Sequence, residues 1–204
     1  GIVTVVAAGN DYYKYQDTGP SPGVSAPAND PNVIPVGAVW QESVGRFFWA
    51  AGAKDFRTAS DRVTSFSQRS TDVDVIFAQG ALITGAAPGG GVDSQGGTSQ
   101  ATPFVAGMVA VAQNMADDLL GRRLTPDEFE NMLRSSATTI YDGDDERDNV
   151  ANLDTPLPRV NILALAQEIK QLAETEGGPS QIVADDFNQG VETDGTVEIG
   201  TQAT

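Results

Sequence analysis

The 204-residue chain contains neither histidine nor cysteine. The absence of cysteine excludes disulfide bonds, thiolate metal sites and cysteine nucleophiles, but leaves the compartment open, because secreted proteins without disulfides exist. The absence of histidine removes the most common general base of enzyme catalysis at neutral pH. Any reaction that needs an imidazole must take it from outside these residues.

Basic residues and long apolar runs are also scarce. Twelve Lys and Arg face 28 Asp and Glu, and the net charge of −16 repels nucleic-acid phosphates and anionic lipids. The longest apolar stretches, such as residues 105–112, are far too short to cross a bilayer, and no signal-peptide pattern opens the chain. The composition therefore argues against nucleic-acid partners and membrane-spanning segments.

Strand and helix patterns alternate along the chain. Short β-branched or apolar runs bounded by turn residues predict buried strands at residues 2–8, 32–39, 72–78 and 81–84. Small and apolar residues, and an N-cap with proline at the first helical position, predict helices over about 99–115, 125–137 and 160–173. This order predicts an α/β fold of three layers, with a mainly parallel sheet flanked by helices.

The composition changes near the C-terminal end. Residues 171–204 contain no Lys or Arg and seven acidic residues, and "EGGPSQ" resembles a linker. We place a boundary near residue 175, with residues 1–174 as the main domain. Residues 175–204 are either an acidic linker or tail or the start of a further domain.

The segment "GGTSQATPFVAG" (96–107) places Ser99 in a glycine-rich turn that opens a helix. At such a turn, free backbone N–H groups and the helix dipole favour negative charge, which is the environment an oxyanion needs. Pro103 is unusual so early in the helix, because it removes a backbone hydrogen bond at a cost of roughly 3 kcal/mol in an ordinary interior. This proline predicts a specialised helix start.

"GTSQATPFVAG" resembles the catalytic-serine segment of the subtilisin-like serine proteases, Gly-Thr-Ser-x-Ala-x-Pro-x-Val-Ala-Gly. Other segments resemble that family in the same order: "VVAAGN" (5–10), "APANDPNVIPVGA" (26–38), "VTSFSQRS" (63–70), "FAQG" (77–80), "LTPDEFENMLRSSAT" and "RVNILALA". The resemblance covers about residues 1–172. It implies the family's α/β fold, incomplete at the N-terminus.

The resemblance assigns roles at the site. Ser99 matches the nucleophile, Asn10 matches the oxyanion-hole asparagine, and Thr98 either assists the oxyanion or forms the turn. The family's triad runs Asp, His, Ser, so the first two members are expected upstream of Gly1. The chain is thus expected to be the C-terminal part of a catalytic domain, inactive alone, with the missing N-terminal half as its partner.

The resemblance also implies a pocket for the side chain that precedes the scissile bond. Ala7, Ala8 and Gly9 match its wall, and Ser25, Ala26 and Pro27 match its floor and rim. Because these residues are small and uncharged, we expect a preference for large apolar or aromatic side chains. The resemblance further implies a cis peptide bond before Pro27.

Three features depart from the pattern or leave alternatives open. Gln79 stands where the family has proline. The long insertion from Trp40 to about Arg62 carries Phe47, Phe48 and Trp49, which form either a hairpin packed on the domain or a rim for substrate. "YDGDDERDN" (141–149) groups five carboxylates that are either solvated or calcium ligands, although the loop lacks EF-hand spacing.

The leading hypothesis is a secreted or cell-surface serine endopeptidase that acts on protein or peptide substrates. Its chemistry requires no cofactor, and structural calcium is an open expectation from the family. The alternative is a non-catalytic pseudoprotease or protein-binding module that kept Ser99 while its other half lost the base. The presence or absence of the upstream Asp and His motifs distinguishes the two.

Overall fold

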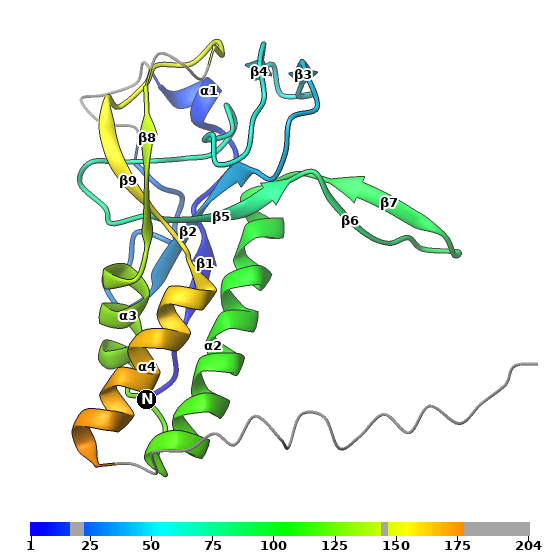
Figure 1. Cartoon of the computed structure of the whole chain (residues 1–204). Coiled ribbons are helices and arrows are strands. Elements are labelled where there is room, and N and C mark those ends of the chain that lie inside the picture. Colours follow the sequence, from blue (N-terminus) through cyan, green and yellow to red (C-terminus); the bar gives the residue numbers. More distant parts are fainter. Residues whose placement is uncertain (17–22, 144–146, 178–204) are drawn as a thin grey trace, which may run out of the picture.

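The computed structural model describes residues 1–16, 23–143 and 147–177. Its main sheet has the order β1-β2-β5-β9-β8, in which β1, β2, β5 and β9 run parallel and β8 is antiparallel to β9 (Figure 1). These strands span Val5–Ala7, Ile34–Trp40, Ile76–Ala81, Thr155–Arg159 and Thr138–Asp142, respectively. The predicted α/β fold with a mainly parallel sheet flanked by helices is confirmed.

Three long helices cover one face of this sheet (Figure 1). They are α2 (Thr98–Leu120), α3 (Pro126–Ser135) and α4 (Ile162–Glu176). Small residues on the buried side of α2, such as Ala101, Ala112 and Ala116, let this helix approach the strands closely. A capping box between Thr125 and Glu128 starts α3, as its sequence predicts.

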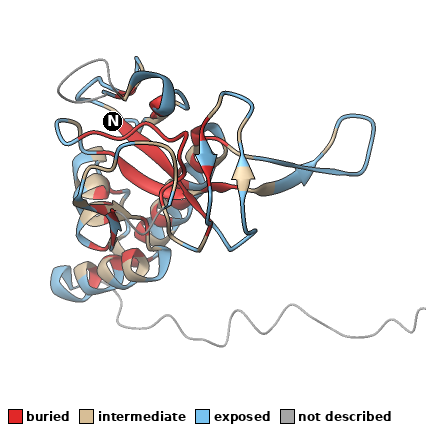
Figure 2. Ribbon diagram, turned by 90° about the horizontal axis from the view of Figure 1, so that it is seen from above, coloured by how far each residue is buried: buried red, intermediate tan, exposed pale blue. Residues whose placement is uncertain are grey.

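The opposite face of the sheet is covered by loop residues. Val39 and Phe77 point to this side and pack in a second core cluster with Ala8, Val24 and Val63, among others. Buried strands at the centre of the molecule are consequently enclosed on both faces (Figure 2). The short helix α1 (Tyr12–Tyr15) follows β1 at the carboxyl edge of the sheet.

Two small hairpins lie outside the main sheet. β3 (Phe47–Phe48) pairs with β4 (Lys54–Asp55), and β6 (Ile83–Ala86) pairs with β7 (Val92–Gln95). The β6–β7 hairpin projects from the body with mostly exposed residues (Figures 1 and 2). The prediction of a buried strand at 81–84 is therefore wrong, because this segment leaves the sheet after β5 and pairs only locally.

The predicted boundary near residue 175 falls at the end of α4, where Gly177 adopts the left-handed conformation of a helix C-cap. The acidic segment beyond it, residues 178–204, lies outside the described residues. No helix in the described ranges is long and apolar enough to cross a membrane.

Candidate active site

The end of β1 delivers Asn10 to the carboxyl edge of the sheet. Gly9 precedes it with φ of +115°, a conformation that side chains rarely adopt. The Gly9 carbonyl accepts a 2.9 Å bond from the Gln68 backbone N–H, and the Ala8 N–H donates to Val36 in β2 at 2.9 Å. These bonds fix the strand end from which the exposed Asn10 projects.

The turn before Ser99 is bound to the end of β5. The Gly97 N–H donates to the Gly80 carbonyl at 2.8 Å, and a Cβ on Gly80 would lie 2.8 Å from the Gly97 carbonyl oxygen. A Cβ on Gly96 would lie 2.4 Å from the Trp49 ring. Glycine is required at both positions, because the backbone and the indole approach too closely for any side chain.

Asn10 and the start of α2 form one hydrogen-bonded unit. The Asn10 Oδ1 atom accepts bonds from the Thr98 backbone N–H at 2.8 Å and from the Thr98 hydroxyl at 2.9 Å. The Thr98 hydroxyl in turn accepts from the Gly9 N–H at 3.2 Å. Because Thr98 is fully buried and donates its proton to Asn10, its hydroxyl orients the asparagine amide.

Two N–H donors at the start of α2, the Ser99 backbone N–H and the Nδ2 group of Asn10, which is bound to Thr98, remain without partners in the described part of the chain. By contrast, the next two N–H groups, of Gln100 and Ala101, bond to the Gly97 carbonyl. Ser99 itself is exposed at the second position of α2. The site therefore combines an exposed hydroxyl with free donors at a helix N-terminus, where negative charge is favoured.

Pro103 fits this helix start. It has no N–H to bond the Ser99 carbonyl four residues earlier, and it lies on the exposed side of α2. The hydroxyl of Thr102, the residue directly before it, donates to the Thr98 carbonyl at 2.8 Å. The first turn is thus held by a side chain, in accordance with the specialised start that the sequence predicts.

The structure brings several predicted pocket residues beside Asn10. The Ser25 N–H donates to the Ala8 carbonyl at 2.8 Å, which joins the predicted floor to the predicted wall. Ser25 is half-buried, Ala26 and Pro27 are exposed, and the peptide bond between the latter two is cis. Ala7 is half-buried in β1, whereas the Ala8 side chain is fully buried in the core and offers the pocket only its backbone.

Sequence reasoning missed Gln68 at this site. Its Oε1 accepts a 2.6 Å bond from the Ser25 hydroxyl, and its Nε2 donates to the Gly23 carbonyl at 2.7 Å. Gln68 is almost fully buried. The only signal in the sequence is its place in "VTSFSQRS", and no periodicity indicates which distant backbone groups its amide meets.

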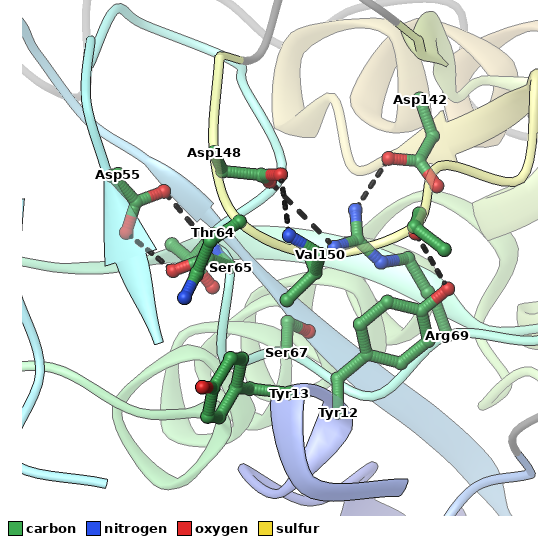
Figure 3. Close-up of polar contacts among 12 residues, drawn as sticks. Tyr12, Tyr13, Asp55, Thr64, Ser65, Ser67, Arg69, Asp142, Asp148 and Val150 are labelled. Atoms are coloured by element: carbon green, nitrogen blue, oxygen red, sulfur yellow. Dashed lines mark hydrogen bonds and ion pairs between the residues drawn. The ribbon is translucent and has the colours of Figure 1, made fainter. Parts of the chain in front are cut away.

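The next residue in the sequence, Arg69, belongs to a buried ionic cluster (Figure 3). Arg69 is fully buried, forms an ion pair with Asp142, lies 4.0 Å from an Asp148 oxygen and places its guanidinium 4.2 Å from the centre of the Tyr12 ring. The Tyr12 hydroxyl donates to the Ala151 carbonyl at 2.8 Å. The cluster joins α1, the loop after Gln68 and the end of β8.

Burial dominates the electrostatics of the two carboxyl groups. Removal from water raises the pKa of Asp142, against the lowering effect of Arg69. It raises the pKa of Asp148 to about 6. The Asp148 Oδ2 atom and the Arg69 Nη2 atom are buried without hydrogen-bond partners among the described residues. Keeping these charged groups buried therefore costs desolvation free energy.

Two of the five carboxylates of the acidic loop are described, and neither is solvated. Asp142 and Asp148 are buried beside Arg69 rather than solvated, because they balance its charge. Asp144, Asp145 and Glu146 lie outside the described residues. In the described ranges, no group of three or more His, Cys, Asp or Glu residues is arranged to hold a metal ion.

The aromatic insertion is packed against the turn that carries Ser99. Phe47 and Trp49 pack with Trp40 and Phe66 at centroid distances of 4.4 to 5.7 Å, and Phe48 remains exposed. Buried Asp55 accepts bonds from both indole N–H groups, at 3.1 Å from Trp40 and 2.6 Å from Trp49. The insertion is thus a packed hairpin whose Trp49 supports Gly96.

A family model described as the subtilase family matches residues 1–159. The chain belongs to this family. Its fold is that of the subtilisin-like structures described below, and the sequence resemblance is confirmed at family level.

Curated relatives of this subtilase segment include a subtilisin-like protease 1 from Trichophyton rubrum, 38% identical over 110 residues. Subtilisin amylosacchariticus from Bacillus subtilis subsp. amylosacchariticus is 36% identical over 111 residues. The matched residues make up 54% of this chain in both cases, but 17% and 23% of those proteins. The chain therefore corresponds to only a part of its relatives.

Solved structures match a larger share of this chain than the curated relatives do. The prenylagaramide maturation protease PagA matches with a TM-score of 0.60 and 26% identity, over 82% of this chain and 50% of that protein. The patellamide maturation protease PatA matches with a TM-score of 0.58 and 25% identity, over 83% and 52%. The subtilase segment spans about half the length of these proteases.

Proposed function

We propose that this chain supplies the nucleophile and the oxyanion hole of a serine endopeptidase. The observation that carries the proposal is the pair of free donors at Ser99, its own N–H and the Asn10 amide. The Ser99 Oγ atom attacks the carbonyl carbon of a peptide bond, and these two groups donate to the oxygen that becomes negative. The reaction as proposed requires no cofactor.

A general base is needed to remove the Ser99 proton, and none of the chain's own motifs provides one. The sequence has no histidine, so we propose that the catalytic Asp and His come from a segment outside these residues. That the matched segment covers only about half of the solved relatives supports this division. The chain alone is then inactive, because an unactivated hydroxyl is a weak nucleophile.

Exposed features of this chain also support the proposal that another segment packs against it. Among the described residues, β1 pairs only with β2, which leaves one edge of β1 unpaired. Ile2, Phe104 and Val111 are exposed, and a cavity of about 450 Å³ lies between residues 1–3 and the α2 and pre-α3 residues. Unpaired edges and exposed apolar side chains favour association, so the chain expressed alone is expected to be poorly stable or to aggregate.

Protein or peptide substrates and secretion to the cell exterior or surface are parts of the same proposal. Family membership supports the peptide substrate, and residues Gly9, Ser25, Ala26 and Pro27 beside Asn10 provide a surface for the side chain before the scissile bond. Secretion stays a prediction from the family. A structural calcium ion also stays a prediction, with no support from the described carboxylates.

The second candidate is a non-catalytic pseudoprotease with the same fold. The match to the subtilase family and the relatives named as proteases support the enzyme over this alternative. An upstream segment without the Asp and His would favour the pseudoprotease.

The test is hydrolysis of fluorogenic peptides by three proteins: the full-length protein that contains this chain, its Ser99→Ala variant and the isolated chain. We expect hydrolysis only from the first, with a loss of roughly 10⁶-fold on Ser99→Ala, the size known for a subtilisin rather than one obtained from this site. Hydrolysis that survives Ser99→Ala would refute the assignment of the nucleophile. Ser99-dependent turnover by the isolated chain would refute the external base.

A further inference from the structure

The side chain of Gln68 lies directly against the predicted pocket wall. A Cβ added to Gly9 would be 2.0 Å from the Gln68 Oε1 atom and 2.4 Å from the Ser25 hydroxyl. The amide and the hydroxyl therefore occupy the space immediately beside the Gly9 Cα atom. Gly9 and Ser25 are half-buried and Gln68 is 5% exposed, so this corner lies just below the surface.

Hydrogen bonds fix the orientation of this amide. The Gln68 Oε1 and Nε2 atoms bond to Ser25 at 2.6 Å and to the Gly23 carbonyl at 2.7 Å, and its backbone N–H bonds to the Gly9 carbonyl at 2.9 Å. One residue thus joins the end of β1 to the loop that carries the predicted floor. The side chain cannot swing aside without breaking its two bonds, and the third bond holds the backbone of the same residue.

Arg69, the next residue, restrains the backbone at Gln68. Arg69 is fully buried, paired with Asp142 and stacked on the Tyr12 ring, which lies two residues after Asn10 (Figure 3). Moving the backbone at residue 68 would displace a buried charge from its partners, which is strongly unfavourable. The amide is therefore a rigid boundary rather than an adaptable one.

We propose that Gln68 determines specificity by setting how large a side chain the pocket accepts before the scissile bond. This inference rests on the proposed peptidase function. It differs from the sequence expectation of a preference for large apolar or aromatic side chains, which considered only the small residues at 7–9 and 25–27. Shortening Gln68 opens space beside Gly9 and Ser25, and a change of one or two methylenes in such a pocket alters discrimination by about 10- to 200-fold.

The experiment uses the full-length protein and fluorogenic peptides that differ only in the residue before the scissile bond, alanine or phenylalanine. We expect Gln68→Ala to raise the ratio of kcat/KM for phenylalanine over alanine by about 10-fold. Gln68→Asn, which is one methylene shorter, should change the ratio in the same direction by less. Gln68→Met, which keeps about the same volume but loses the two hydrogen bonds that fix the side chain, should raise the ratio by less than Gln68→Ala does.

Gln113 provides a matched control, because its side chain also makes two hydrogen bonds, to the Leu124 backbone, far along α2 from Ser99. Gln113→Ala should leave the ratio unchanged, so a loss of stability alone will not imitate the effect. Ser99-dependent hydrolysis with an unchanged ratio in Gln68→Asn, or in Gln68→Ala, overturns the role of Gln68 alone. Absence of Ser99-dependent hydrolysis in the unmodified protein overturns the peptidase proposal and this inference with it.

Discussion

Two neighbouring polar clusters at the carboxyl edge of the sheet differ in how fully their groups are engaged. The reactive cluster (Asn10, Thr98 and Ser99) is partly exposed and keeps free N–H donors within the described residues. The anchoring cluster (Tyr12, Arg69, Asp142 and Asp148) is buried, and its charges face one another. Groups left free are available to a reacting substrate, whereas groups paired inside the protein position the backbone around them.

We expect substitutions in the two clusters to impair different properties of the protein. Variants of the anchoring cluster should reduce stability, and variants of the reactive cluster should reduce rate with little change in stability. Each variant below is made in the full-length protein.

The largest expected effect is that of Arg69→Met. Removing the cation leaves Asp142 and Asp148 buried without their partner, so we expect a loss of about 3–5 kcal/mol in the free energy of unfolding, measured by denaturant titration. Arg123→Met is the control, because Arg123 is 77% exposed and its ion pair with Asp117 is long, at 3.7 Å. That pair should contribute less than about 1 kcal/mol. Equal losses in the two variants would show that Arg69 anchors nothing.

Asn10→Ala should have the next largest effect, and on rate rather than stability. Loss of one oxyanion donor is expected to lower kcat by about 10²- to 10³-fold with little change in KM, a size taken from a subtilisin. Asn114→Ala, on the exposed side of α2, removes an equivalent amide without touching Ser99. If Asn10→Ala changes KM and leaves kcat intact, the amide binds the substrate rather than the oxyanion.

The smallest expected effect is a change in the pH dependence of stability in Asp148→Asn. Burial raises the folded-state pKa of Asp148 to about 6 from 3.8, so the folded protein binds this proton more tightly than the unfolded chain does. Stability from this group is present below the lower pKa and is lost as pH rises through about 6. Arg69, Asp142 and Asp55 are the charged groups that act on it.

We therefore expect the Tm of Asp148→Asn relative to the unmodified protein to rise between pH 4 and pH 7. Glu42→Gln, which removes one exposed carboxylate, serves as the control. A Tm difference that is constant over this range would contradict the assigned burial effect.

The elements with local signals were predictable from the sequence. The β-branched run that forms β2, the capping residues of α3 and the small-residue face of α2 each determine their structure over a few consecutive residues. The meeting of Ser99 and Asn10 at one edge of the sheet was predictable from the family resemblance, because its motifs are short and contiguous, and their catalytic roles stay predictions. Their meeting follows from parallel strands, whose carboxyl ends share one edge of the sheet.

The parts that depend on distant contacts were not predictable. Arg69 and Asp142 are 73 residues apart in the sequence. Arg and Asp are mostly found at protein surfaces, so neither residue type indicates a buried ion pair. The strand β9 carries Pro156 and Pro158, which weaken a strand pattern because proline cannot donate to a ladder. The exposed β6–β7 hairpin was mistaken for part of the sheet because its short apolar start resembles a buried strand.

The central claim is that Ser99 is a nucleophile prepared by this chain and activated by a base outside it. Labelling with a fluorophosphonate probe, located by mass spectrometry of peptides, tests this claim most directly, because the probe forms a stable adduct only with an activated serine. We predict labelling at Ser99 in the full-length protein, and none in its Ser99→Ala variant or in the isolated chain. Efficient labelling of Ser99 in the isolated chain, or labelling of the full-length protein at a different serine, would contradict the account.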